Sequence, residues 1–182
     1  EYYPHKSMTI WVKFPVKSAP QPELVGASAV IWTTTTWTIP GNRAMAFHDD
    51  IKYGVYRVDA VAEGSLAQVG ERLIIADEPA EATAQAAKVE SWTREDLNVD
   101  LTGAIAHHPL KGQGYDYDVP MFHGDYVTTE QGTGLVHIAP GHGFDDWQLA
   151  TVKHGIEVPM TVAEDGSFYD HVPLFAGLTV YN

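Results

Sequence analysis

The sequence contains no cysteine, which excludes disulfide bonds, thiolate metal sites and a cysteine nucleophile. Basic residues are scarce, since 11 Lys and Arg stand against 24 Asp and Glu, for a formal net charge of −13. A protein that binds a nucleic-acid duplex neutralises its phosphates with a basic patch or stripe, so extensive duplex binding by this chain alone is not expected. A short single-stranded end bound in a pocket needs few contacts and stays open as a ligand.

Signatures of several other protein classes are also missing. No apolar run has the length of a transmembrane helix, and the first residues do not form a signal peptide. Neither a Gly-x-Ser-x-Gly elbow nor a phosphate loop occurs, which argues against a serine hydrolase and against nucleotide activation. The chain has 182 residues, 45% of them hydrophobic, and is predicted to be one domain, 1–182. Because it begins without methionine, we expect it to be excised from a larger protein.

Hydrophobic alternation and turn residues predict a chain built mainly of strands. We expect strands over residues 8–16, 27–34, 44–47, 52–59, 66–69, 72–76, 100–106, 125–129 and 135–139, helices over 79–90 and 144–154, and extended structure over 158–162 and 178–181. The strands do not alternate with helices, which argues against a doubly wound parallel sheet. The predicted fold class is α+β, with a closed or half-closed β-barrel-like core of mostly antiparallel strands and a few peripheral helices.

The most unusual segment is a threonine run between two tryptophans, Trp32 and Trp37, which follows an apolar strand and ends in Pro40-Gly41-Asn42. A strand that ends in threonines and a turn presents several O–H and N–H groups to one small volume. This arrangement suits the binding of an ester or a ribose. A solvated, threonine-rich edge strand is the alternative, because threonine favours β structure.

A second segment, residues 132–147, contains a short apolar strand, a Pro-Gly-His-Gly turn and the start of a helix. Asp145 and Asp146 lie in the first turn of that helix, where the backbone N–H groups and the macrodipole favour an ionised carboxylate. We expect one of the two aspartates to cap the helix and the other to face a cationic ligand; the alternative is that both only cap. Gly155 is predicted to end the helix.

Two kinds of hydrolytic site fit these residues. His137, His142, Asp145 and Asp146 could bind a divalent metal, although their spacing matches no known metal motif. Alternatively, threonine hydroxyls and backbone amides fix an ester, an ionised aspartate holds a substrate ammonium, and a histidine limits the depth of the pocket. This second site would hydrolyse aminoacyl esters without a metal. Four other histidines, at positions 107, 108, 123 and 171, are predicted to lie in turns or at the surface.

The two segments resemble the editing insertion, connective peptide 1, of isoleucyl-tRNA synthetases. That family has Trp-Thr-Thr-Thr-Pro-Trp-Thr ending in Pro-x-Asn-Arg, and later Gly-Thr-Gly-x-Val-His-x-Ala-Pro-Gly-His-Gly-x-Asp-Asp; this chain has both in order, at 32–43 and 132–146. Residues 1–3 and 178–181 resemble the edges of the insertion, so the resemblance covers essentially the whole chain. The related synthetases for valine and leucine carry an acidic residue at the position of Trp37. Thr36 replaces the usual proline, and Gly41 a commoner alanine.

The resemblance implies proofreading, in which valine wrongly attached to isoleucine tRNA, or to AMP, is hydrolysed. Isoleucine and valine differ by one methylene, which changes the free energy of binding to a hydrophobic pocket by only about 1–3 kcal/mol. A second pocket that excludes isoleucine therefore adds selectivity. The implied partners are the 3′ end of tRNA(Ile) carrying valine and valyl-adenylate, in a monomeric, cytoplasmic parent without membrane contact; an organellar parent stays open. No cofactor is implied in this domain, since ATP and zinc would belong to the rest of the parent enzyme. The synthetase signatures His-Ile-Gly-His and Lys-Met-Ser-Lys-Ser are absent, so the chain is not expected to aminoacylate.

Matched position by position, the resemblance gives the threonines and one aspartate the central roles. The implied catalytic residues are Thr33, Thr34, Thr35 and Asp146, with Asp146 holding the substrate amino group. The implied substrate-binding residues are Thr36, Trp37, Thr38, Asn42, His137, His142, Asp145 and Asp146, with His137 excluding isoleucine. No metal ligand is implied. Two further hypotheses stay open: a module that binds the tRNA 3′ end without activity when isolated, and the His/Asp metal-dependent hydrolase.

Overall fold

A computed structural model describes residues 8–181, so the predicted N-terminal edge at residues 1–3 lies outside the described part. The elements are β1 (Ile10–Ser18), η1 (Pro22–Leu24), β2 (Ser28–Thr33), η2 (Thr36–Gly41), β3 (Ala44–Phe47), β4 (Tyr53–Val61), β5 (Arg72–Ala76), α1 (Ala80–Ala86), β6 (Val89–Arg94), β7 (Ile105–His107), β8 (Asp118–His123), β9 (Val136–Ile138), α2 (Phe144–Trp147) and η3 (Gln148–Lys153). Within residues 8–181, no helix is long and apolar enough to cross a membrane.

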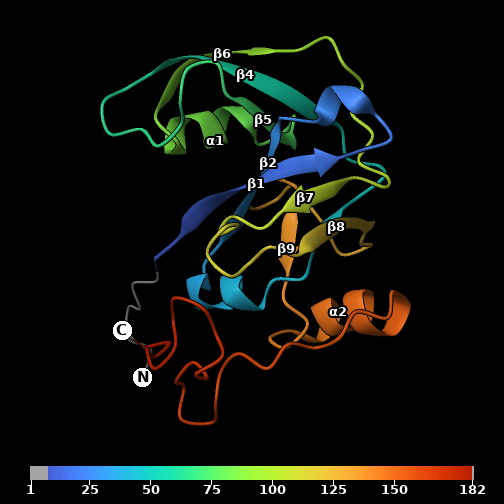
Figure 1. The fold of residues 1–182 in the computed structure, drawn as a ribbon. Coiled ribbons are helices and arrows are strands. Elements are labelled where there is room, and N and C mark those ends of the chain that lie inside the picture. Colours follow the sequence, from blue (N-terminus) through green and yellow to red (C-terminus); the bar gives the residue numbers. More distant parts are fainter. Residues whose placement is uncertain (1–7, 182) are drawn as a thin grey trace, which may run out of the picture.

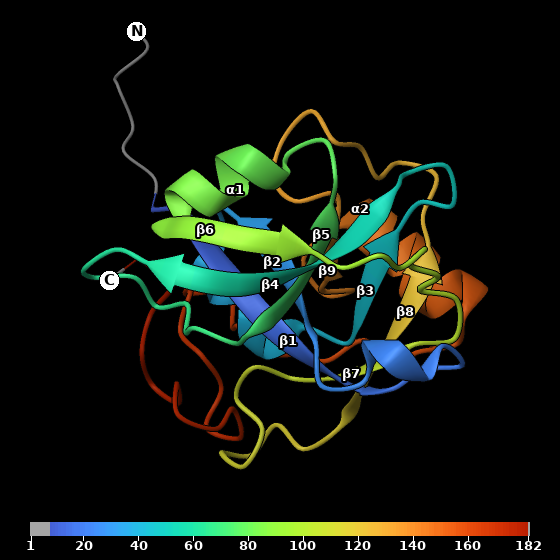
Figure 2. The same cartoon turned by 90° about the horizontal axis from the view of Figure 1, so that it is seen from above.

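Nine strands form one mixed sheet in the order β6-β4-β5-β2-β1-β7-β8-β3-β9 (Figures 1 and 2). Most neighbours are antiparallel, whereas β2 with β5 and β3 with β8 are parallel. The edge strands β6 and β9 do not pair with each other within the part of the chain described, so the sheet is not closed. The structure therefore confirms the strand-dominated α+β fold, and the predicted possibility of full closure is wrong.

Three hydrophobic clusters hold the sheet and its helices together. The largest lies on one face of the sheet and includes Phe14, Ile31, Met45 and Ile74. A second cluster packs the opposite face of β2, β4 and β5 against α1, at the top of Figure 1. A third joins β3 and β9 to η3. Because strand side chains alternate between faces, β2 is buried on both sides, which fixes where its threonine-bearing end emerges.

Several predicted elements match, and the mismatches have physical causes. The strands Ala44–Phe47 and Arg72–Ala76 have the predicted bounds. Residues 66–69 form no strand, because Leu66 and Val69 are 90% and 64% exposed and have no core to pack against. Residues 125–129 form a turn rather than a strand, and the paired strand Asp118–His123 precedes it.

The remaining mismatches lie in the helix at 79–90 and in the later loops. The helix ends at Ala86, and the next residues turn to form β6, which pairs with β4. Lys88 makes this turn with φ +56, a left-handed conformation that ends a helix. Residues 100–106 are mostly loop, with only the start of β7 inside them. The extended segments at 158–162 and 178–181 supply only isolated bridges, Val162 to Phe168 and Ser167 to Thr179.

The helix that follows β9 begins and ends near its predicted limits. It runs as α2 and then widens into the π-helical η3, and Gly155 ends it with φ +70, as predicted. Its N-cap is Gly143, and no side chain caps it. The expectation that one of the two aspartates, Asp145 or Asp146, caps the helix by a side-chain hydrogen bond is therefore wrong, although both lie in the first turn.

Candidate functional site

The threonine run changes direction at the end of β2. Thr33 is the last residue of the strand and is buried, and its hydroxyl accepts the backbone N–H of Thr35 at 3.1 Å. This bond bends the chain into η2, which begins at Thr36. The side chains of Thr34 and Thr35 are thereby exposed, and Thr36 is half-buried. The structure thus presents two adjacent threonines to solvent rather than leaving them in a regular edge strand.

Residues 132–147 meet the threonine run through β9. His137 lies in the middle of β9 and pairs with Met45 of β3. Its Nε2 is 2.9 Å from the hydroxyl of Thr38, and its Nδ1 is 3.3 Å from the amide nitrogen of Asn42. The two segments, about a hundred residues apart in sequence, are therefore joined by a buried polar network.

The hydrogen-bond directions in this network assign the protonation of His137. The hydroxyl of Thr38 donates its proton to the carbonyl of Thr35 at 2.8 Å, so it accepts from His137 Nε2–H. The amide of Asn42 donates to the carbonyl of Ala44 and to Nδ1 of His137, which is therefore unprotonated. Burial, reinforced by the charges of two other histidines, lowers the pKa of His137 to about 4. The imidazole is neutral, and protein groups hold both of its nitrogens.

Asn42 is held from its backbone as well as from its side chain. Its carbonyl accepts from the Tyr117 hydroxyl at 2.6 Å and from Arg43 at 2.7 Å. The Arg43 guanidinium also lies 4.2 Å from the centre of the Tyr117 ring. Burial raises the pKa of Tyr117 to about 12, so its hydroxyl keeps its proton and donates. These contacts fix the turn that carries Asn42, and the sequence analysis did not identify Tyr117.

His142 also packs against η2, where it contacts Trp37. Its ring meets Trp37 edge-on, with 4.9 Å between centroids, and its Nε2 lies 3.0 Å from the Thr161 hydroxyl. A Cβ at Gly41 would lie 3.0 Å from the His142 ring, so the glycine gives this ring its space. Burial lowers the pKa of His142. His142 and Trp37 thus form one aromatic contact, and Thr161 is a partner that no motif had indicated.

Asp146 is half-buried beneath the turn that leads into α2. Its Oδ2 accepts the backbone N–H of Ala139 at 2.8 Å. Burial raises the pKa of its carboxyl, the Ala139 N–H lowers it, and the charge of the exposed Asp145 raises it again. Among residues 8–181, no basic side chain forms an ion pair with Asp146. A partly desolvated carboxylate of this kind is stabilised by an approaching cation more than an exposed one is. The arrangement therefore suits Asp146, and not Asp145, to a substrate ammonium.

His108 contradicts the expectation of a turn or surface residue. It is only 1% exposed and stacks on Tyr115, with 4.6 Å between ring centroids. Its Nε2–H donates to the carbonyl of Ile39 in η2 at 3.0 Å, and its Nδ1 accepts the N–H of Leu110. His108 therefore holds η2 in place through its hydrogen bond to Ile39. No spacing signal in the sequence distinguished it from its neighbour His107.

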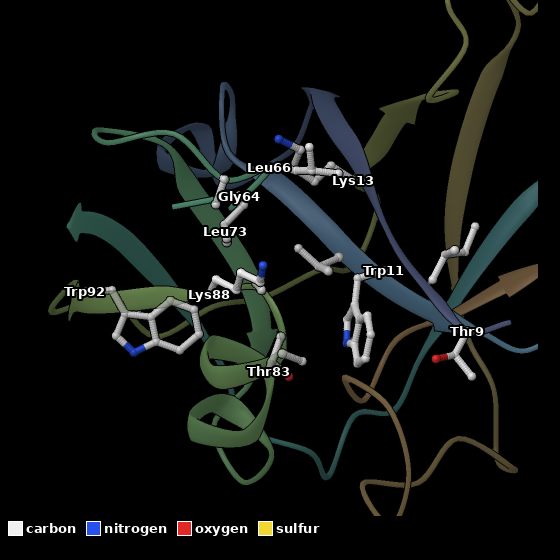
Figure 3. Close-up of a pocket in the computed structure, with 14 residues that line it drawn as sticks. Thr9, Trp11, Lys13, Gly64, Leu66, Leu73, Thr83, Lys88 and Trp92 are labelled. Atoms are coloured by element: carbon white, nitrogen blue, oxygen red, sulfur yellow. The ribbon is translucent and has the colours of Figure 1, made fainter. Parts of the chain in front are cut away.

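A separate apolar cavity of about 300 Å³ lies under α1 (Figure 3). Trp11 of β1, Thr83 of α1 and Trp92 of β6 contribute to its walls. None of the residues matched to the family motifs lines it. We therefore place the site at the threonine run, where polar groups converge, rather than at this cavity.

The chemistry that the site can perform follows from its polar groups. The threonine run has exposed hydroxyls, His137 supplies a rigid neutral imidazole, and Asp146, which bonds to Ala139 two residues beyond His137, supplies a half-buried carboxylate. Groups of these kinds suit the fixing of a polar, cationic substrate. The alternative metal site would use His137, but protein groups occupy both of its nitrogens. Among the described residues, metal-capable side chains gather instead at His48, His123 and Asp125.

Comparisons with known proteins identify the family and the fold of the chain. The family model described as "Leucyl-tRNA synthetase, editing domain" matches residues 74–173. The isoleucine--tRNA ligase of Caulobacter vibrioides is 51% identical over 99% of the chain, and that of Gluconobacter oxydans is 46% identical over 100%. The chain spans 19% of the length of each of these relatives. A solved structure, "The crystal structure of GlLeuRS-CP1", superposes with a TM-score of 0.67 over 95% of this chain and 91% of its own, at 15% identity, and shows the same fold.

Proposed function

Because the chain belongs to the editing-domain family of the class I aminoacyl-tRNA synthetases, we propose that it is a proofreading hydrolase that removes valine from tRNA(Ile). The observation that carries this proposal is the fixed imidazole of His137, bonded on one side to Thr38 and on the other to Asn42. A ring held at both nitrogens cannot move aside for a longer side chain. It therefore limits the depth of a pocket that accepts valine and rejects isoleucine.

The other residues have complementary roles in this proposal. Asp146 pairs with the substrate ammonium, and the hydroxyls of Thr34 and Thr35, with the backbone of Thr36, hold the ester and the terminal ribose. Thr33 shapes the turn that exposes them. A water molecule positioned between the protein and the substrate then attacks the ester carbonyl, and the carbonyl oxygen is stabilised by hydroxyl and N–H donors. The amino acid and the free tRNA end are the products.

The same proposal extends to the wider context of the domain. Its partners are the 3′ end of tRNA(Ile) carrying valine and valyl-adenylate, and its parent is a cytoplasmic, monomeric synthetase. Cleavage uses no cofactor in this domain. With a net charge of −13, the chain binds only the unpaired end of the tRNA, and other parts of the parent hold the rest.

A pair of non-hydrolysable ligands tests this function. We expect a valyl-adenosine analogue to bind the chain at least tenfold more tightly than its isoleucyl counterpart, and binding of both to weaken in Asp146→Asn. The variant keeps an oxygen for the Ala139 N–H and loses only the charge, so it is expected to fold. Equal binding of the two analogues, or full binding in Asp146→Asn, would show that the pocket is not the proposed sieve.

A further inference from the structure

A second group of ionisable side chains lies where β3 and β8 end. These strands are parallel neighbours, with Phe47 opposite His123, so the residues that follow them emerge at the same edge of the sheet. Residues 48–50, His-Asp-Asp, follow β3, and Asp125 lies two residues after His123. One nitrogen each of His48 and His123 and one oxygen of Asp125 lie within 4.8 Å of one another.

We propose that His48, His123 and Asp125 bind one divalent transition-metal ion of the zinc class. Two imidazoles and one carboxylate are a ligand set that zinc and its neighbours accept, whereas magnesium and calcium prefer oxygen alone. Three protein ligands leave a fourth position for water. Nε2 of each imidazole and the Asp125 carboxylate are the ligand atoms.

The Nδ1 atoms are already positioned by the turn after β3. The N–H of Asp49 donates to His123 Nδ1 and the N–H of Asp50 to His48 Nδ1, both at 3.1 Å. In the metal-free state the ring protons therefore lie on Nε2, and His123 Nε2–H donates to Asp125 Oδ1 at 2.8 Å. The Nε2 side of His123 thus already faces the carboxylate that would share the metal.

Metal binding moves one proton within each ring. Nε2 releases its proton to give a lone pair to the metal, and Nδ1 takes up a proton, so each imidazole stays neutral. A carboxylate is at hand for each new Nδ1–H: Asp49 Oδ2 is 3.3 Å from His123 Nδ1, and Asp50 Oδ2 is 4.0 Å from His48 Nδ1. A metal-bound histidine ordinarily donates its other N–H to such a group. The two exposed backbone N–H groups then bond to water.

Packing holds the two imidazoles, whereas the Asp125 carboxylate is exposed and is bonded only to His123 among the described residues. The ring centroids of His48 and His123 are 4.7 Å apart, and His123 also packs edge-on against Phe47. The histidine side chains are 21% and 28% exposed, whereas that of Asp125 is 94% exposed and can rotate onto a metal. Two of the three ligands therefore lose little freedom on binding. The site is distinct from the threonine site, since His48 lies three residues beyond Met45, the partner of His137, or about 10 Å along the strand.

Calorimetric titration of the 182-residue chain, free of any histidine tag, with zinc chloride tests this proposal. We expect one equivalent to bind, Asp125→Asn to weaken the affinity at least about tenfold, and His123→Gln to abolish binding. The matched control is His171→Gln, which removes another exposed histidine, bonded to the carbonyl of Met160, and is expected to leave binding unchanged.

A second measurement keeps the proposal testable if His123→Gln fails to fold. Cobalt(II) bound to the wild-type chain is expected to give visible d–d absorption bands that zinc displaces and that Asp125→Asn alters, and this variant changes only an exposed side chain. Absence of binding to the wild-type chain would overturn the proposal. Equal zinc affinity and unchanged cobalt bands in Asp125→Asn would also overturn it, as would loss of binding in His171→Gln.

Discussion

The imidazole Nε2 of His137 and the hydroxyl of Thr38 lie 2.9 Å apart, although 99 residues separate them in the chain. Through this contact β9 and η2 share one buried hydrogen-bond network, which also includes the carbonyl of Thr35 and the amide of Asn42. The candidate site is therefore formed by the threonine run and β9 together, and neither sequence segment forms it alone.

Thr38→Val tests the energetic value of this contact. The substitution keeps the shape of the side chain but leaves the buried His137 Nε2–H without its partner, whereas the carbonyl of Thr35 keeps the backbone N–H of Thr38. An unpaired buried polar group costs about 1–3 kcal/mol, so the free energy of unfolding in urea should fall by that amount. Thr34→Val, at an exposed position, is the control and should change it by less than about 0.5 kcal/mol. Equal, small effects in both variants would show that the network contributes nothing to stability.

The neutral state of His137 predicts a stability loss in acid. Its pKa of about 4 lies below the ordinary 6.5, so between these pH values the unfolded chain binds a proton that the folded chain does not. Stability should therefore fall as the pH drops from 6.5 towards 4, by roughly 3 kcal/mol in total from this residue. The measurement compares urea unfolding of the wild type and His137→Asn across this range. Because other histidines titrate in both proteins, the difference isolates His137; a constant difference would contradict the lowered pKa.

Gly134 precedes β9 in a conformation and a space that only glycine fits. Its φ is +78, and a Cβ there would lie 2.5 Å from the Cβ of the buried Ala76. Gly134→Ala should therefore cost about 2–4 kcal/mol, because overpacking adds to backbone strain. Gly70→Ala has a similar φ of +88 but nothing within 4 Å, so about 1 kcal/mol of strain is expected. Unfolding curves that give the two variants equal stability would show that Ala76 can move aside.

The regular parts of this fold could be predicted where apolar runs end in turn residues, as at Ala44–Phe47 and Arg72–Ala76. Prediction of the strands failed where the burial of a residue differs from what the polarity of its side chain suggests. Leu66 is apolar but exposed, and the strand Asp118–His123 contains Pro120 and polar ends that conceal it. The roles of Thr38 and His137 stay predictions, but their contact could not have come from spacing, because it depends on how β9 pairs with β3. The burial of His108 likewise depends on η2 folding over it.

Asp145→Asn should shift the pH dependence of hydrolysis. In the proposed mechanism, the ammonium of the substrate pairs only with ionised Asp146, whose pKa is raised chiefly by burial and further by the charge of Asp145. Activity should therefore decline in acid through a pKa above the ordinary aspartate value of 3.8. Removing the Asp145 charge lowers the pKa of Asp146, so the acid limb of kcat/KM should move to lower pH. Asp170→Asn, an exposed aspartate elsewhere, is the control; an acid limb that stays in place in Asp145→Asn would contradict this coupling.

The most direct test of the account is deacylation of valyl-tRNA(Ile) and isoleucyl-tRNA(Ile) by the wild-type chain and by Asp146→Asn. The account predicts that the wild type cleaves the valyl ester faster than its spontaneous hydrolysis and the isoleucyl ester at least about tenfold more slowly, as one methylene permits. It also predicts that Asp146→Asn loses the valyl activity while its circular dichroism is unchanged. Equal cleavage of the two esters, or undiminished cleavage by Asp146→Asn, would contradict it.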